Sequence, residues 1–207
     1  MTKKVSPKTS RGVRRGERLT NGSRDRCGRR YNAFTLIELI VVVSIIAVLG
    51  ALVLSTAGYA RKKGARARAE TEISAMSAAC ENYKADNGVY PSNTDTNNLD
   101  PKTGGDPNSS SYSLASFYLY TQLSGDTTGS RSPTGKSYMQ FKPNILLPAG
   151  GSGTVTAIAD PFGYSYGYST IQAATQDTTK GYNPTFDLWS TASGTTIGDA
   201  PKWIKTW

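Results

Sequence analysis

One stretch decides how this chain folds, and it reads Ala33-Phe34-Thr35-Leu36-Ile37-Glu38-Leu39-Ile40-Val41-Val42-Val43. A basic, polar leader ends at this point and a long apolar run begins. Glu38 is the only charged residue between positions 34 and 60. A carboxylate inside an apolar segment of membrane length is costly, so its presence predicts a function.

The charge of the chain is concentrated before this junction. The formal net charge is +9, and residues 1–33 hold 11 Lys and Arg against two acids. Residues 34–207 hold the other 13 basic and 13 acidic groups, which balance. This distribution argues against a nucleic-acid-binding surface and favours a topogenic signal, because Lys and Arg beside a span stay cytoplasmic. We expect residues 1–33 to be disordered, because they contain almost no large apolar side chains.

Residue usage excludes several kinds of chemistry. The sequence contains no His, which excludes Ser-His-Asp and Cys-His catalysis and all His-containing metal sites. Its two cysteines are Cys27 and Cys80, so loss of the leader leaves Cys80 without an intrachain partner. An exported domain of this kind depends on packing rather than on a disulfide.

A single long helix is predicted from Phe34 to about residue 86. Residues 34–60 contain no Pro and exceed the roughly 20 residues that span a bilayer. Residues 61–87 continue the helix with five cations followed by an amphipathic segment, which Asn87-Gly88 ends. Apolar residues recur there at helical spacing, at Ala69, Ile73, Met76, Cys80 and Tyr83. A coiled coil is the alternative for this stripe, which is shorter than about three heptads.

Residues 88–207 are predicted to form a small α+β head. Residues 92–111 have loop composition, and residues 114–123 are typical of a short helix. Strands are predicted at 154–159, 164–168 and 185–189, the first two joined by a type I turn at residues 160–163. The C-terminal segment, residues 203–207, is apolar enough to be anchored. Gly135-Lys136-Ser137 resembles the end of a phosphate-binding loop, but Ser130 stands where that motif needs Gly.

Several processing routes fit parts of the junction. An ordinary secretory signal would be cleaved near residues 55–57, but the apolar run before them is too long. Arg29-Arg30 suggests a twin-arginine signal, with the same objection. A plain membrane anchor explains the length and the flanking charges. None of these routes explains Glu38.

The segment Phe34 to Leu39 resembles the N-terminal signature of type IV pilins and type II secretion pseudopilins. The resemblance implies that a membrane prepilin peptidase cuts between Ala33 and Phe34 and that Phe34 becomes N-methylated. The family favours Gly before the cut, so Ala33 is a departure. The resemblance also implies that Glu38 pairs with the Phe34 amino terminus of a neighbouring subunit, so that two buried charges neutralise each other on assembly.

Three groups of residues narrow this resemblance to the major pseudopilins of type II secretion, also known as general secretion pathway protein G. They lie at residues 83–91, 123–126 and 160–164, and the segment 186–190 is similar as well. The implied fold is α+β and type IV pilin-like. In it a long N-terminal helix, with a membrane part at 34–60 and an amphipathic part at 61–87, packs against a small antiparallel head at 88–207 with a short extra helix.

The chain departs from that group at two further places. Ser55 stands where the family often has Pro in its apolar helix. Family members of this type bind Ca²⁺ after the last strand, and the matching candidates here are the carbonyls of Leu188 and Ser190 and the carboxylate of Asp199. Because Ca²⁺ takes six to eight oxygens with several charged ligands, these residues predict at most a weak site.

The expected function is that of a structural subunit rather than an enzyme. The resemblance implies a type II secretion pseudopilus subunit in the bacterial inner membrane, with the leader cytoplasmic and the head periplasmic. Implied partners are prepilin peptidase, further copies, other pseudopilins and the inner-membrane assembly platform. No cofactor or nucleic acid is expected. The alternatives are a subunit of a type IV pilus, for adhesion, motility or DNA uptake, and a single-span membrane-anchored enzyme or receptor.

Overall fold

The computed structural model describes residues 34–207, except for the side chains of residues 55–57. The predictions for the leader, for Cys27 and for Ala33 therefore lie outside the described residues. Helix α1, Leu36–Asn87, is a single helix of 52 residues, as the sequence predicts. The chain divides into two units within this helix, one ending at Ala47 and one comprising Val48–Trp207.

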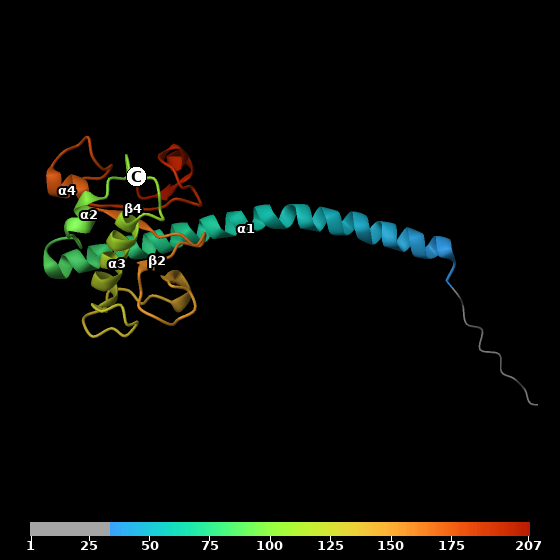
Figure 1. Cartoon of the computed structure of the whole chain (residues 1–207), viewed down its shortest axis with the longest axis horizontal. Coiled ribbons are helices and arrows are strands. Elements are labelled where there is room, and N and C mark those ends of the chain that lie inside the picture. The colour runs from blue at the N-terminus through green and yellow to red at the C-terminus, as the bar shows by residue number, and fades with distance from the viewer. Residues whose placement is uncertain (1–33) are drawn as a thin grey trace, which may run out of the picture. The chain divides into compact units, whose positions relative to one another are not determined.

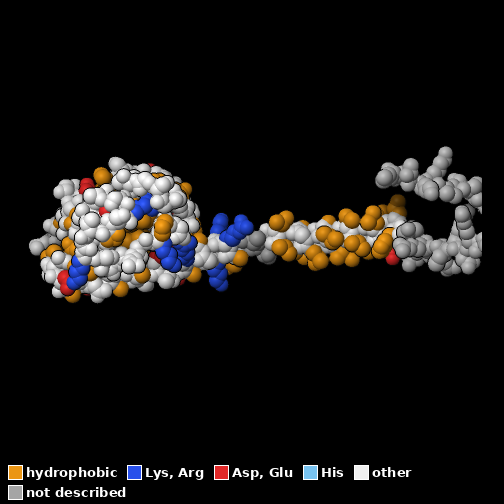
Figure 2. Space-filling view, turned by 90° about the horizontal axis from the view of Figure 1, so that it is seen from below, with side chains coloured by type: hydrophobic (Ala, Val, Ile, Leu, Met, Phe, Trp, Pro, Cys, Tyr) orange, Lys and Arg blue, Asp and Glu red, His pale blue; other side chains and the backbone are white. Residues whose placement is uncertain are grey.

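The described part of the first unit, residues 34–47, is an apolar segment on which no other described residue packs. Its large side chains are exposed, from Phe34 at 82% to Val42 at 50%. Helix α1 is long and apolar enough to cross a membrane by length and composition. Figure 2 shows apolar side chains along the visible face of this part of the helix. So much contiguous apolar surface is not stable in water and needs lipid or other helices to cover it. The boundary expected at residue 60 stays a prediction.

In the second unit, the C-terminal part of α1 buries one stripe against the head. Ala69, Ile73, Met76 and Cys80 are all at most 5% exposed, and Tyr83 is partly buried. The predicted stripe is therefore confirmed. Burial raises the pKa of the Cys80 thiol to about 12, so this thiol is inert at neutral pH.

The end of α1 follows the predicted signals. The Gly88 N–H donates to the Lys84 carbonyl at 2.7 Å, and Gly88 adopts a φ of +77°. The Asn87 side chain donates to the Tyr83 carbonyl at 2.9 Å. These bonds satisfy carbonyls that the last turn would otherwise leave without partners.

Two further helices precede the sheets. Helix α2, Thr94–Asn98, lies in a segment predicted as a loop. It forms because Asn93 and Thr96 make a reciprocal capping box. The polar composition of this segment predicts a loop and does not reveal such a cap. Helix α3, Ser110–Ser124, begins four residues before the predicted 114 and ends at Gly125, whose φ is +75°. Figure 1 shows α3 crossing α1, and both helices contribute to one core cluster.

The strands form two small antiparallel sheets, ordered β1-β2 and β3-β4-β5. The strands are β1 (Leu146–Leu147), β2 (Ala157–Ile158), β3 (Gly167–Ser169), β4 (Asp187–Ser190) and β5 (Ile204–Lys205). The remaining elements are α4 (Ile171–Thr175) and two 3₁₀ turns, η1 (Pro143–Ile145) and η2 (Ile197–Lys202).

The predicted hairpin between residues 154 and 168 is only partly present. The turn forms, because the Asp160 carboxylate accepts the N–H groups of Phe162 and Tyr164 at 3.0 and 2.9 Å. Beyond the turn, the ladder is limited to a bridge between Ala159 and Ser165. The two arms then separate, since β2 pairs with β1 and β3 pairs with β4.

Polar contacts join the head to α1. The Tyr166 hydroxyl donates to Glu72 at 2.8 Å, and the Arg66 guanidinium donates to the Lys202 carbonyl at 2.8 Å. Near the end of α1, the Tyr83 hydroxyl donates to Gln122 at 3.0 Å. These contacts come from three separate parts of the head, so they fix its orientation on this part of the helix.

A cluster of aromatic rings anchors the C-terminus. Trp189 in β4 is fully buried, and its ring lies 6.0 Å from that of Trp203 at an angle of 12°. The Trp189 indole N–H donates to the Tyr112 hydroxyl at 3.0 Å. The predicted anchoring of residues 203–207 is thereby confirmed, with β5 as the last strand of its sheet.

Gly167 supports this cluster, and its replacement tests the packing. A Cβ at position 167 would lie 2.2 Å from the Trp189 ring. We expect Gly167→Ala to lower the free energy of unfolding by about 2 kcal/mol or more, because the buried ring has no room to move. The three tryptophans of the chain all lie in the head, so their fluorescence during denaturation in detergent reports the change.

The matched control is Gly64→Ala, on the exposed side of α1. A Cβ there meets nothing within 4 Å. We expect it to leave the head unchanged or stabilise the helix by about 0.5–1 kcal/mol. Equal effects of the two substitutions would contradict the packing described for Trp189.

Candidate functional site

The first turn of α1 holds Glu38 in a reciprocal cap with Thr35. The Glu38 N–H donates to the Thr35 hydroxyl oxygen at 3.2 Å, and the Thr35 N–H donates to the Glu38 carboxylate at 3.2 Å. The Thr35 hydroxyl donates to the same carboxylate oxygen at 3.0 Å. This arrangement is a capping box. Its signal in the sequence is the Thr-x-x-Glu pattern at residues 35–38, which the prediction for Glu38 did not include.

The cap uses only part of the hydrogen-bonding capacity of the Glu38 carboxylate. A carboxylate has about four acceptor positions. The contacts from Thr35 converge on Oε2, and no described residue donates to Oε1. Phe34 is 82% exposed, and within the described chain no hydrogen bond joins it to Glu38. The carboxylate can therefore accept a cation from outside the chain while it still caps the helix.

The carbonyl candidates for Ca²⁺ lie in β4, where both residues are fully buried. The Leu188 carbonyl accepts the Thr206 N–H at 3.1 Å and so belongs to the contact with the C-terminal segment. The Ser190 hydroxyl donates to Asp160 at 2.5 Å and accepts the Ala192 N–H at 3.1 Å. Burial raises the pKa of Asp160, and the hydrogen bonds that its carboxylate accepts from Ser190, Tyr164 and Phe162 oppose that rise.

Asp199 faces a cation that belongs to the protein itself. One carboxylate oxygen lies 3.0 Å from the Lys202 ammonium, and the other accepts the Thr196 hydroxyl at 3.0 Å. These two partners lower the pKa of Asp199. A Cβ at Gly194 would lie 2.5 Å from that of Asp199, so the glycine lets the loop close on the carboxylate.

The loop after β4 leaves few oxygen atoms free for a Ca²⁺ ion. The ion needs six to eight oxygen ligands, whereas here the Asp199 carboxylate is paired with Lys202 and the Leu188 carbonyl is already bonded. Among residues 34–207, no group of three or more Cys, Asp or Glu side chains is placed to hold a metal. The weak site predicted from the sequence stays a prediction.

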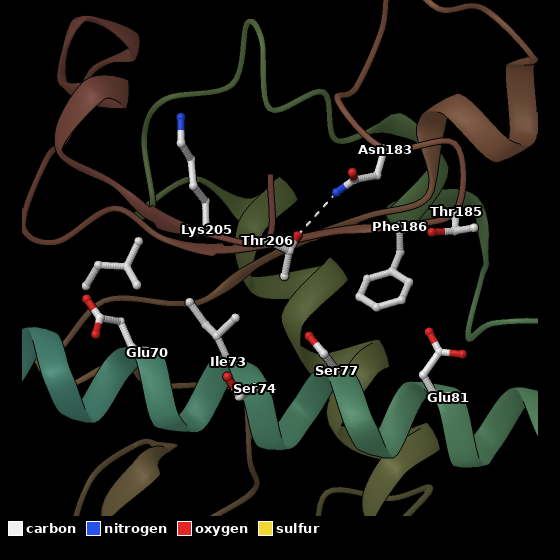
Figure 3. A pocket seen from close by; sticks show the side chains of 11 residues that line it. Glu70, Ile73, Ser74, Ser77, Glu81, Asn183, Thr185, Phe186, Lys205 and Thr206 are labelled. Carbon is white, nitrogen blue, oxygen red and sulfur yellow. Dashed lines mark hydrogen bonds between the residues drawn. The ribbon is translucent and has the colours of Figure 1, made fainter.

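A groove on the head also lacks a catalytic arrangement. It encloses about 600 Å³ between α1 and the β4–β5 side of the head. In Figure 3, Glu70 and Glu81 project from α1 at opposite ends of this groove. Eleven residues of helix separate them by about 16 Å, too far for a pair of carboxylates acting on one bond. Glu81 is also bonded to the Tyr90 hydroxyl at 3.0 Å.

The loop after β4 leads to a prediction about Ca²⁺. We expect excess Ca²⁺ and excess chelator to give the same thermal midpoint for the head, because Lys202 occupies the side of Asp199 that a metal would need. Lys202→Gln should lower the midpoint at neutral pH, and less so at acid pH. The lowered pKa of Asp199 explains this pH dependence. The ion pair stabilises the head while Asp199 is charged, and this contribution is lost as the pH falls through the folded-state pKa of Asp199.

Lys142→Gln is the matched control, because Lys142 is an exposed cation of the head that pairs with no carboxylate among residues 34–207. A rise of the wild-type midpoint in Ca²⁺ would contradict the assignment of Lys202.

The comparisons with known proteins agree with the N-terminal features. The prokaryotic N-terminal methylation motif matches residues 28–54. The type II secretion system core protein G of Pectobacterium carotovorum is 38% identical over 65 residues, which cover 31% of this chain and 42% of that protein. The protein of the same name from Pseudomonas aeruginosa is 41% identical over 64 residues, covering 31% and 45%.

A third relative, core protein G of Vibrio cholerae, is 38% identical over 63 residues, covering 30% of this chain and 43% of that protein. The chain spans less than half the length of these curated relatives. No solved structure matches it significantly. The chain thus carries the prepilin-type methylation motif and is similar, over about a third of its length, to core protein G of type II secretion.

Proposed function

We propose that this protein is a structural subunit of a type II secretion pseudopilus without catalytic activity of its own. Prepilin peptidase removes the leader between Ala33 and Phe34, and Phe34 is then N-methylated. The subunit polymerises through α1 to support protein export. The observation that carries this proposal is the prepilin-type motif at the start of a helix whose large apolar side chains, from Leu36 to Leu54, are all at least half exposed.

The exposed apolar surface of α1 is suited to two successive environments, first the lipid bilayer and then the filament. As a single span it is covered by lipid, with the basic leader cytoplasmic and the head periplasmic. After extraction into a filament, the helices of neighbouring copies cover it. Small residues allow close helix approach, at Ser44, Ala47, Gly50 and Ala51. The partners are accordingly further copies, other pseudopilins and the inner-membrane assembly platform.

Glu38 gives this assembly its register. Cleavage creates a free amino group at Phe34, four residues before Glu38. In a bundle of helices, the carboxylate of one copy pairs with the amino terminus of the next. Because each charge is costly to bury alone, the pair favours one axial offset over others. The exposed Phe34 and the unused oxygen of Glu38 leave both groups available for this contact.

Two alternatives have less support. A type IV pilus subunit would share the processing and the helix, but the similarity found is to secretion proteins. A membrane-anchored enzyme or receptor would need convergent polar groups in a pocket. In the groove between α1 and the β4–β5 side of the head, the carboxylates of Glu70 and Glu81 lie far apart along α1.

The processing site is tested by N-terminal sequencing and intact mass of the protein from membranes. We expect the mature chain to begin at a methylated Phe34, and Ala33→Leu to leave the leader attached because the bulkier side chain blocks the peptidase. Ala33→Gly serves as the control that restores the family's residue. A start near Gly58 would indicate ordinary secretion, and an intact wild-type leader would indicate a plain anchor.

The role of the Glu38 charge is tested by separating it from the cap. Glu38→Gln keeps a side chain that can cap the helix but removes the charge, so we expect normal membrane insertion and loss of filaments. Thr35→Ala removes the cap partner at a cost of about 1 kcal/mol to the helix start but keeps the charge, so we expect filaments to form. Electron microscopy of sheared filaments and carbonate extraction give the two readouts.

If Glu38 served only as a cap, the two variants would behave in the opposite way. Normal filaments with Glu38→Gln would rule out the charge pair.

A further inference from the structure

A small hollow lies where the head meets the basic part of α1. It encloses about 220 Å³ and is lined by Lys62 and Arg66 of the helix and by Phe162, Ala192 and Ser193 of two head loops. All five residues belong to the unit Val48–Trp207. The processing site at Ala33 and Phe34 and the proposed contact of Glu38 include no residue of this hollow.

The hollow lies next to the end of the apolar run. Tyr59, which is 72% exposed, is the last large apolar residue before the cations. Lys62 follows about 5 Å further along the helix axis. When the apolar run spans a bilayer, Lys62 and Arg66 therefore lie at the level of the lipid headgroups. Figure 2 shows Lys and Arg side chains gathered on this part of the helix.

The charge of the hollow is not neutralised within the described chain. Five cations occur between residues 61 and 68, and the first acid after them is Glu70. Arg68 pairs with Glu72 at 2.8 Å, but among residues 34–207 no carboxylate lies within ion-pair distance of Lys62 or Arg66. The hydrogen bond from Arg66 to the Lys202 carbonyl holds the guanidinium in place and leaves its charge intact.

The other walls suit the boundary between headgroups and water. Phe162 follows the turn that Asp160 holds, is partly buried against the head core and provides an apolar wall of the hollow. Ala192 and Ser193 have φ values of +50° and +76°, so the loop bends sharply beside the helix. The exposed Ser193 hydroxyl can donate a hydrogen bond to a phosphate oxygen.

We propose that this hollow binds the phosphate of an anionic phospholipid in the leaflet next to the head. Two cations and one hydroxyl donor match the charge and the acceptor oxygens of a headgroup phosphate, and the adjoining span places the hollow at the bilayer surface. The lipid orients the head before assembly and is released when the helix leaves the membrane. This inference rests on the proposed membrane-anchored state and does not require a filament.

The test compares two neighbouring lysines in the full chain. The protein is placed in nanodiscs with equal amounts of phosphatidylglycerol and phosphatidylcholine, and native mass spectrometry counts the lipids that it retains. We expect a preference for phosphatidylglycerol that falls about fivefold in Lys62→Gln, as one charge at a membrane surface would give. Lys63→Gln is the control, because Lys63 is an exposed cation of the same segment that does not line the hollow.

Each other outcome would overturn the lipid site. An equal fall with Lys63→Gln would show a general effect of charge. Displacement of phosphatidylglycerol by inorganic phosphate would show a site for free anions. Loss of filaments in Lys62→Gln with unchanged lipid selectivity would assign the lysine to a contact between copies. Carbonate extraction of the wild type separates the two proposals: an inserted chain without lipid preference overturns the lipid site alone, whereas an extractable chain overturns the membrane-anchored state.

Discussion

The structure depends on one constraint, which is that a single helix must be compatible with two different surroundings. The N-terminal part of α1 exposes apolar side chains on every face, whereas residues from Ala69 onward bury one stripe in the head. Lipid or neighbouring helices must cover the first part, because contiguous apolar surface is unstable in water. The head is stable on the second part because tyrosine, leucine and methionine side chains fill a common core there.

The charged groups of the protein are arranged around this change of surroundings. Glu38 caps the first turn and keeps one oxygen available, which suits a group that meets its partner only on assembly. The cations from Arg61 to Arg68 follow the apolar run, where long side chains reach the interface. In the head, the ion pair between Lys202 and Asp199 lies in the loop after β4.

Local patterns predicted much of this arrangement. The helix, its buried stripe and its end at Asn87 follow from spacing and from residue preferences that act within a few residues. The prediction was less successful for α2 and for the hairpin. Helix α2 depends on a cap between Asn93 and Thr96, and β2 and β3 take partners far away in the sequence. The turn signal at Asp160 predicts that the chain reverses its direction. It does not predict that β2 pairs with β1 and β3 with β4.

The sequence by itself determined the apolar span, the charge asymmetry of the leader and the prepilin-type junction, because these properties reside in consecutive residues. Only the tertiary structure decided that Asp199 faces Lys202, that the Leu188 carbonyl accepts the Thr206 N–H, and that Phe162 lines one hollow with Lys62 and Arg66. Contacts of this kind depend on which distant segments share a surface. Their energies are individually small and are decided by the packing of the whole head.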